Sequence, residues 1–255
     1  FEGYNLVISH TTRFAKSIVT KPNTSHICYC HTPPRFLWHL SEPGRFGLGE
    51  LMMSKLRVYD QISSRRVDHF LAGSLNAQKR IKKIYGRDSR VVYPFLDLER
   101  FKEVDTFDGG YFLMIARPNK YKRIDLAKKA CDKLGMSLKI ISGGVDDKIL
   151  VAILAGCRAL IIPGIEDFGL VSLEAQALGK PVIAFKEGGV LETVIEGKTG
   201  FFFDTQTVES LIAAIKKLDS KKINPDDCKQ NAYHFNKEDF KDNFKQEVAS
   251  LVYTK

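Results

Sequence analysis

The sequence predicts an α/β protein built on parallel sheets. Short apolar segments of strand length alternate along the second half of the chain with segments that carry helical spacing of apolar residues. This alternation is typical of parallel sheets that helices cover on both faces. The composition, 44% hydrophobic residues with 17 Phe and 9 Tyr in 255 residues, excludes intrinsic disorder. No apolar run reaches the roughly 18–20 residues of a membrane-spanning helix.

Residues 106–255 are predicted to form the C-terminal domain. The expected strands are residues 111–116, 137–141, 159–162, 181–185 and 200–203. The expected helices are residues 122–134, 146–155, 168–177, 190–195, 208–218 and 237–253, and the last of these is expected to pack back on the N-terminal domain. Ligands of such sheets bind beyond the carboxyl ends of the strands, so the turns there are the first places to search for a site.

Residues 1–105 are predicted to form the N-terminal domain, with the boundary inside a polar connector at residues 97–108. The expected strands are residues 5–9, 27–30, 69–72 and 90–93. The expected helices are residues 47–55, 56–66 and 76–85. The last of these is basic, but basic helices are common solvated faces and no nucleic-acid-binding motif accompanies it, so we expect no nucleic-acid partner.

The positive charge is concentrated in the first part of the chain. Residues 1–100 hold 16 Lys and Arg against 8 Asp and Glu, whereas the remainder holds 23 against 22, for a net charge of +9. The imbalance predicts that the N-terminal part meets an anionic partner such as a phosphate or a membrane surface. The five cysteines have no zinc-binding spacing and are odd in number, which favours buried thiols and a reducing compartment.

Three motifs follow predicted strands. Glu166 and Glu174 stand eight residues apart in EDFGLVSLE, the first in a turn and the second in the following helix. They can both face a ligand. Alternatively, the first caps the helix and the second is a solvated helix residue. Arg117 and Lys122, in RPNKYK, can hold a diphosphate at a strand-to-helix turn or form a solvated basic turn. The glycine pair after Glu187 can bring backbone N–H groups close to an anion.

The order of these motifs along the chain resembles the retaining glycosyltransferases of family 4, which have the GT-B fold of two Rossmann-like domains. Residues 111–203 carry the resemblance. Four of the expected strands in this segment are each followed by a motif, in the order R-x4-K, GG, PGxEDFGx4E and EGGxxE. In the first half, HICYCHTPPRFLW and KRIKKIYGRDSRVVYPFLD resemble the bacterial mannosyltransferase branch.

The resemblance implies a role for each matched residue. Arg117 and Lys122 match residues that bind the donor diphosphate. Glu166 matches the glutamate that faces the donor sugar, and Glu174 matches the glutamate that hydrogen-bonds the ribose hydroxyls. Phe168, Gly169 and Leu170 match the segment whose N–H groups open the helix near the sugar and diphosphate, and Gly143 matches a glycine near the nucleotide. His31 matches a first-domain histidine that contacts the donor sugar, although a lone histidine is also compatible with a structural role. Gly73 stands where the family has Asn.

The implied reaction moves a hexose with retention from a nucleotide sugar, GDP-mannose in this branch, to a glycan or lipid-linked acceptor. The family needs no metal, and we expect none. The branch also implies a cytoplasmic protein at the inner face of the membrane, where the basic N-terminal part would contact anionic lipid.

The sequence departs from the family in length. The N-terminal domain is expected to be incomplete, because FEGYNLVIS resembles a segment well inside it, and a helix and strand are expected to be missing near Gly144-Val145. The missing part favours one alternative, a truncated, non-catalytic subunit that binds a nucleotide sugar. A second alternative is a GT-B isomerase or phosphorylase, although the family-4 pattern in residues 166–203 argues against it.

Overall fold

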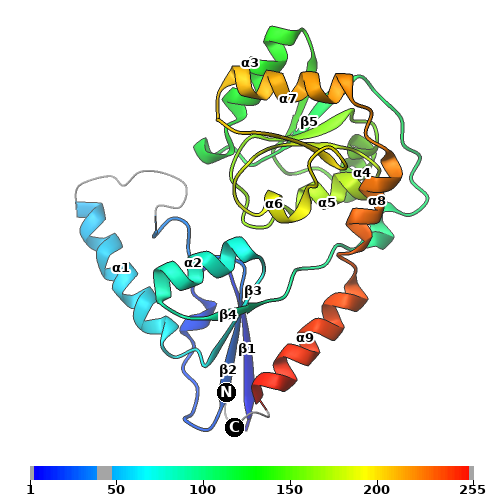
Figure 1. Cartoon of the computed structure of the whole chain (residues 1–255). Coiled ribbons are helices and arrows are strands. Elements are labelled where there is room, and N and C mark those ends of the chain that lie inside the picture. Colours follow the sequence, from blue (N-terminus) through cyan, green and yellow to red (C-terminus); the bar gives the residue numbers. More distant parts are fainter. Residues whose placement is uncertain (1–2, 39–47, 253–255) are drawn as a thin grey trace. The chain divides into compact units, whose positions relative to one another are not determined.

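The computed structural model describes residues 3–38 and 48–252. Contacts between residues divide the chain into two units, one made of Phe1–Pro94 with Phe240–Lys255 and the other of Phe95–Asp239. Each unit is built on one parallel sheet with helices on both faces (Figure 1). This confirms the predicted fold class of two Rossmann-like α/β domains.

The sheet of the first unit has four parallel strands in the order β1-β2-β3-β4. The strands are β1 (Leu6–Thr11), β2 (Ser25–Cys30), β3 (His69–Ala72) and β4 (Ser89–Val91). The helices are the 3-10 helix η1 (Ala15–Ser17), α1 (Leu48–Ser64), α2 (Leu75–Tyr85) and α9 (Lys237–Val252). Alternate side chains of β2 and β3 enter two separate cores, because successive residues of a strand point to opposite faces.

One of these cores contains Cys28, Cys30 and Phe70, which pack against Ala77 and Ile81 of α2. The other contains Ile27, Tyr29 and Leu71, which pack against apolar residues of α9. The last helix therefore covers one face of the first sheet from Phe240 onward.

The sheet of the second unit has five parallel strands in the order β6-β5-β7-β8-β9. The strands are β5 (Tyr111–Ile115), β6 (Ser137–Ile141), β7 (Ala159–Ile162), β8 (Val182–Phe185) and β9 (Gly200–Phe203). The helices are α3 (Ile124–Leu134), α4 (Asp147–Ala155), α5 (Leu170–Ala177), α6 (Val190–Thr193), α7 (Val208–Ser220) and α8 (Pro225–Tyr233), with 3-10 turns η2 (Leu98–Phe101) and η3 (Lys120–Lys122).

Helices α3 and α7 cover one face of this sheet, and α4, α5 and α8 cover the other (Figure 1). Phe112 and Met114 of β5 enter the core beneath α3 and α7. Leu113 between them enters the core beneath α4, α5 and α8. Strands β5, β7, β8 and β9 are apolar because both of their faces are largely buried, whereas the edge strand β6 carries the exposed residues Ser137 and Lys139.

The structure divides the chain at Pro94, whereas the sequence predicts a boundary near residue 105. Leu96 and Phe101 are buried in the core of the second unit with Leu113 and Leu154, so part of the expected connector is an integral part of that unit. At the other end, the residues from Phe240 leave the second unit and join the first.

Several elements also differ from expectation. The two helices predicted at residues 47–66 form the single helix α1 from Leu48, and Gly47 and Tyr253 lie outside the described residues. Helix α8 has no counterpart in the prediction, although Asn224 caps it and Pro225 begins it, both common helix-start signals. Within the described residues, no helix is both long and apolar enough to cross a bilayer.

Candidate functional site

The second sheet reverses its strand order between β5 and β7. The chain runs from β5 through α3 to β6 on one side, and then returns through α4 to β7 on the other side of β5. Such a reversal leaves a crevice beyond the carboxyl ends of the two central strands, where ligands bind. Arg117 and Lys122 follow β5, and Glu166 follows β7, so three of the predicted site residues lie at this point of the fold.

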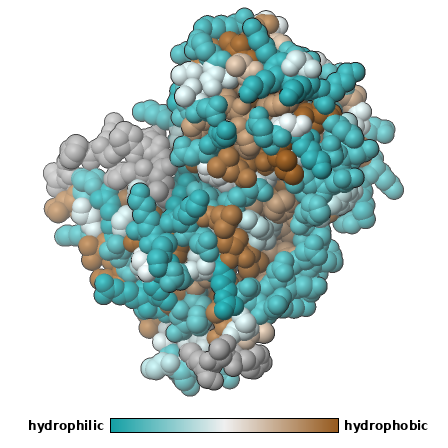
Figure 2. Space-filling view, viewed as in Figure 1, coloured by the Kyte–Doolittle hydropathy of each residue, from teal (hydrophilic) through white to brown (hydrophobic). Residues whose placement is uncertain are grey.

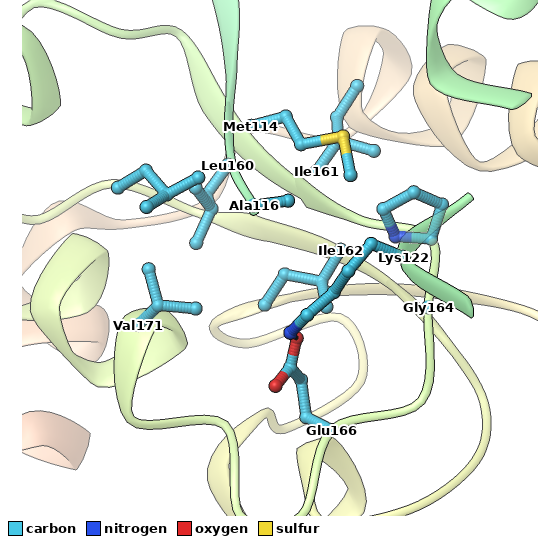
Figure 3. Close-up of a pocket in the computed structure, with 11 residues that line it drawn as sticks. Met114, Ala116, Lys122, Leu160, Ile161, Ile162, Gly164, Glu166 and Val171 are labelled. Carbon is cyan, nitrogen blue, oxygen red and sulfur yellow. Dashed lines mark hydrogen bonds and ion pairs between the residues drawn. The ribbon is translucent and has the colours of Figure 1, made fainter. Parts of the chain in front are cut away.

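Lys122 and Glu166 form an ion pair there. Lys122 Nζ lies 2.6 Å from Glu166 Oε1, and the two side chains are 17% and 18% exposed. They line a small cavity of about 10 Å³ together with apolar side chains at the ends of β5 and β7, and Figure 3 shows the two side chains meeting there. The structure thus brings together two residues that stand 44 positions apart in the sequence.

Gly164 allows the two loops that carry this pair to approach each other. A Cβ at Gly164 would lie 2.9 Å from the Cα of Lys122, and closer still to the carbonyl oxygen of Tyr121. Backbone atoms cannot give way as the end of a side chain can. Any larger residue at position 164 would therefore push the loop of Lys122 away from β7.

The glycine pair after Glu187 fixes the loop that carries Glu166. The Gly189 N–H donates to the Glu166 carbonyl at 2.9 Å. A Cβ at Gly188 would lie 2.6 Å from the same carbonyl oxygen. These glycines serve a close approach between two loops, and the N–H of Gly189 is already used. The prediction that this pair could hold an anion is therefore not supported for Gly189.

The three residues after Asp167 lead into helix α5. Phe168 is buried and stacks edge to face on Phe235, with ring centroids 5.6 Å apart. Gly169 has a φ of +96°, a left-handed conformation that glycine adopts without strain. Leu170 is the first helical residue. The first N–H groups of a helix lack partners within the helix and favour negative charge.

Glu174 lies further along α5 and is paired with a residue that the sequence did not indicate. Arg100 Nη1 donates to Glu174 Oε1 at 2.8 Å. Arg100 also donates from Nε to Asp147 Oδ2 at 3.1 Å and from Nη2 to Asp147 Oδ1. The bonds to Asp147, followed by those to Glu174, raise the pKa of Arg100, and Arg100 in turn lowers the pKa of Asp147.

Arg117 and Gly143 lie at strand ends, and in the described part of the chain Arg117 forms no ion pair like that of Arg100. The Arg117 side chain is exposed, and no ion pair joins it to another residue in the described part of the chain. Gly143 follows β6 with a φ of +121°, and Gly144 has a φ of +72°. The chain passes from this turn directly into α4, with Asp146 capping the helix through the N–H of Lys148.

His31 belongs to the first unit, at the carboxyl end of β2. Its Nε2 lies 2.5 Å from Nε2 of His10, the residue before the end of the neighbouring strand β1. A Cβ at Gly73 would lie 2.9 Å from His31 Nδ1, so the absence of a side chain there makes room for the imidazole.

Comparison with known proteins gives a family match over part of the chain. Residues 138–235 match the family described as glycosyl transferases group 1, from β6 to the end of α8. The matched segment contains Gly143, Glu166 and Glu174.

Curated relatives match shorter segments. The alpha-1,3/1,6-mannosyltransferase ALG2 of Dictyostelium discoideum is 44% identical over 68 residues, which cover 27% of this chain and 16% of the relative. A glycogen synthase of Mycobacterium tuberculosis is 39% identical over 77 residues, 30% of this chain and 19% of the relative. The aligned segments therefore span less than a fifth of the length of these relatives.

Solved structures match nearly the entire fold. A sucrose-phosphate synthase from Thermosynechococcus elongatus superposes with a TM-score of 0.80 at 16% identity, over 99% of this chain and 75% of its own. Anabaena HepE in complex with UDP superposes with a TM-score of 0.67 at 15% identity, over 89% of this chain and 72% of its own. At these identities the likeness defines the fold alone, which is GT-B, and residues 138–235 are similar to glycosyl transferases group 1.

We predict that Gly164→Ala loosens the site. The added methyl group meets backbone atoms of Tyr121 and Lys122, and overpacking of this kind costs about 1–3 kcal/mol. Native-state hydrogen exchange of the amides of β5 and β7 should become faster. Gly49→Ala is the control, because nothing lies within 4 Å of a Cβ there and the position is helical. Equal exchange in the two variants would contradict the role given to Gly164.

Proposed function

We propose that the protein is a retaining glycosyltransferase that moves a hexose from a nucleoside diphosphate sugar to a glycan or lipid-linked acceptor. The observation that carries this proposal is the Lys122–Glu166 ion pair at the reversal of the second sheet, in which Glu166 belongs to the segment that matches glycosyl transferases group 1. Parallel sheets of this topology bind their ligands there, and the two side chains supply one cation and one carboxylate.

Lys122 and Arg117 would hold the donor diphosphate. A departing nucleoside diphosphate carries negative charge that increases as the glycosidic bond breaks. Preorganised cations that face this charge stabilise the transition state more than the ground state. The exposed side chain of Arg117 is available to such a ligand, and the N-terminus of α5 would add unpaired N–H groups at the same end of the sheet.

Glu166 would face the donor sugar. A carboxylate next to a diphosphate would normally repel it, but Lys122 offsets the charge of Glu166 at 2.6 Å. The pair therefore permits a carboxylate to stand close to an anionic donor. Glu174 would accept hydrogen bonds from the ribose hydroxyls, and the turn at Gly143 would lie near the nucleotide.

His31 would contribute to the same reaction from the first unit. The short contact with His10 restricts its imidazole, and Gly73 leaves space beside Nδ1. We propose that His31 keeps the role that the resemblance implies, contact with the donor sugar.

We propose GDP-mannose as the donor. The Dictyostelium relative is named a mannosyltransferase, and the segments around His31 and Pro94 resemble the mannosyltransferase branch. The UDP complex of HepE and the ADP complex of an Arabidopsis thaliana starch synthase make UDP- and ADP-sugars the competitors to test. No metal is expected to take part, because the resembling family meets the diphosphate charge with its basic residues.

A thermal-shift screen tests the donor. GDP-mannose should raise the melting temperature more than UDP- or ADP-sugars at equal concentration, because a ligand stabilises the native state by RT ln(1 + [L]/Kd). The screen should give the same result with EDTA present. A larger shift with a UDP-sugar would overturn the choice of GDP-mannose but retain the transferase. A transfer and hydrolysis assay with the best donor then separates an enzyme from a non-catalytic binding subunit.

Lys122→Ala and Glu174→Ala should each weaken donor binding about tenfold or more, since a charge-assisted hydrogen bond contributes about 1.5–3 kcal/mol. Isothermal calorimetry with the donor identified in the screen measures this. Lys133→Ala is the matched control, because Lys133 also pairs with a glutamate, Glu209 at 3.1 Å, but on the open surface of α3 and α7. Unchanged affinity in both site variants would refute the site.

We further propose that the acceptor side works at an anionic membrane surface. Helix α1 carries an exposed apolar stripe along one face, formed by Leu51, Met52, Val58, Tyr59 and Ile62. Lys55 lies within the stripe, and the residues up to position 100 carry an excess of eight positive charges. Figure 2 shows hydrophobic side chains among hydrophilic ones on the surface. A helix of this kind lies in the lipid interface with its apolar face inserted.

Vesicle sedimentation tests this surface. The protein should sediment with vesicles that contain phosphatidylserine and less with neutral vesicles. Met52→Glu with Ile62→Glu should reduce sedimentation about tenfold, because two apolar contacts are lost and two anionic charges are added. Val19→Glu is the control, since Val19 is more exposed than Met52 or Ile62 but lies outside α1. Equal sedimentation of both variants would contradict docking through α1.

A further inference from the structure

Arg100 connects two carboxylates that lie on different helices of the second unit. Its guanidinium bonds Asp147 at the first residue of α4 through Nε and Nη2, and bonds Glu174 in the middle of α5 through Nη1. A planar guanidinium presents its donors in a fixed fork, so bonds on one edge determine the direction of the other. Asp147 therefore fixes the orientation in which Arg100 meets Glu174.

The backbone of Arg100 is held in place by the core. Arg100 lies in the 3-10 turn η2, between Leu98 and Phe101, and both of these apolar side chains pack in the core of the unit. The guanidinium carbon lies 5.1 Å from the centre of the Phe101 ring. Arg100 thus approaches Glu174 from a rigid position and not from a free loop.

This arrangement leaves one oxygen of Glu174 open. The Glu174 side chain is 15% exposed, and Oε1 accepts from Arg100 at 2.8 Å. Among residues 3–38 and 48–252, no further hydrogen bond reaches the carboxylate. A carboxylate accepts several hydrogen bonds on its two oxygens, so Oε2 retains its full capacity while Oε1 is fixed.

We infer that Arg100 is a positioning residue for donor binding: it holds Oε1 of Glu174 so that Oε2 faces the ribose hydroxyls of the nucleotide. The inference rests on the proposed function of Glu174 and extends it to Arg100 and Asp147. Without Arg100, a mostly buried carboxylate would lose both its fixed direction and its compensating charge. The loss should therefore be felt by ligands that have ribose hydroxyls and not by ligands that lack them.

Calorimetry with UDP, GDP and ADP, each beside its 2′,3′-dideoxy form, tests this inference on the purified protein. Arg100→Gln should weaken the binding of the tightest ribonucleotide about tenfold or more, and leave its dideoxy form bound as in the wild type. Glu174→Gln should give the same selective loss. The double variant should bind no worse than Glu174→Gln alone, because the two residues act through one contact.

The control is Arg158→Gln, because Arg158 pairs with Asp219 elsewhere in the same unit, and both side chains are about one-third exposed. This variant should bind the ribonucleotide and its dideoxy form with the same affinities as the wild type. If Arg100→Gln does not fold, Arg100→Lys serves instead, since an ammonium keeps the charge but cannot bridge both carboxylates in a fixed plane.

Three results would overturn the inference. Equal weakening of the ribonucleotide and its dideoxy form would make Arg100 a purely structural residue, and unchanged binding would remove any role. Tighter ribonucleotide binding would mean that Arg100 competes with the ribose for Glu174. If the wild-type protein binds none of the three nucleoside diphosphates, the proposed function fails first and the role of Arg100 with it.

Discussion

The close approach of two loops at Gly164 is the constraint on which the candidate site depends. Strands β5 and β7 are hydrogen-bonded neighbours, so their carboxyl ends lie together, but neighbouring strand ends do not by themselves bring two side chains into contact. The loop after β5 passes over Gly164 at a distance that no side chain would allow. This contact places Lys122 Nζ at Glu166, and the glycines at 188 and 189 hold the opposite side of the Glu166 loop.

The charges of the site form two ion pairs with similar designs. Lys122 is paired with Glu166, and Arg100 is paired with Glu174, and in each case the carboxylate stands on the segment from the end of β7 into α5. Solvent-exposed ion pairs contribute only about 0–1 kcal/mol to stability. These two pairs are partly shielded from solvent, and both lie on the segment that follows β7. Under the proposed function, these pairs keep carboxylates close to an anionic donor and are not a main source of stability.

Sequence patterns predicted the second sheet well because β5, β7, β8 and β9 are largely buried on both faces and read as continuous apolar runs. The edge strand β6, with exposed Ser137 and Lys139, is the exception. They also placed Lys122 and Glu166 at strand ends, which is sufficient to bring them to one edge of a parallel sheet. Arg100 was not predictable in this way. It lies in a polar segment without periodicity, and its 3-10 turn leaves no repeating pattern, although the buried Leu96 and Phe101 on either side show that the segment is core.

Two further features depend on contacts that no local pattern encodes. The pairing of His10 with His31 follows from the register of β1 and β2, in which the neighbouring Thr11 is opposite Cys30. The sequence predicted that Gly188 and Gly189 could bind an anion through their N–H groups. In the structure these glycines are needed because the loop of Glu166 passes close to their backbone. A glycine motif indicates that some group comes close to the backbone, and only the fold shows which group it is.

The most direct test of the account is a crystal structure of the protein with the nucleoside diphosphate that it binds most tightly among UDP, GDP and ADP. We predict electron density for the diphosphate beyond the carboxyl ends of β5 and β7, with Lys122 Nζ within hydrogen-bonding distance of a phosphate oxygen and the ribose hydroxyls at Glu174. A nucleotide bound at another edge of the sheet, or with its phosphates out of reach of Lys122, would contradict it.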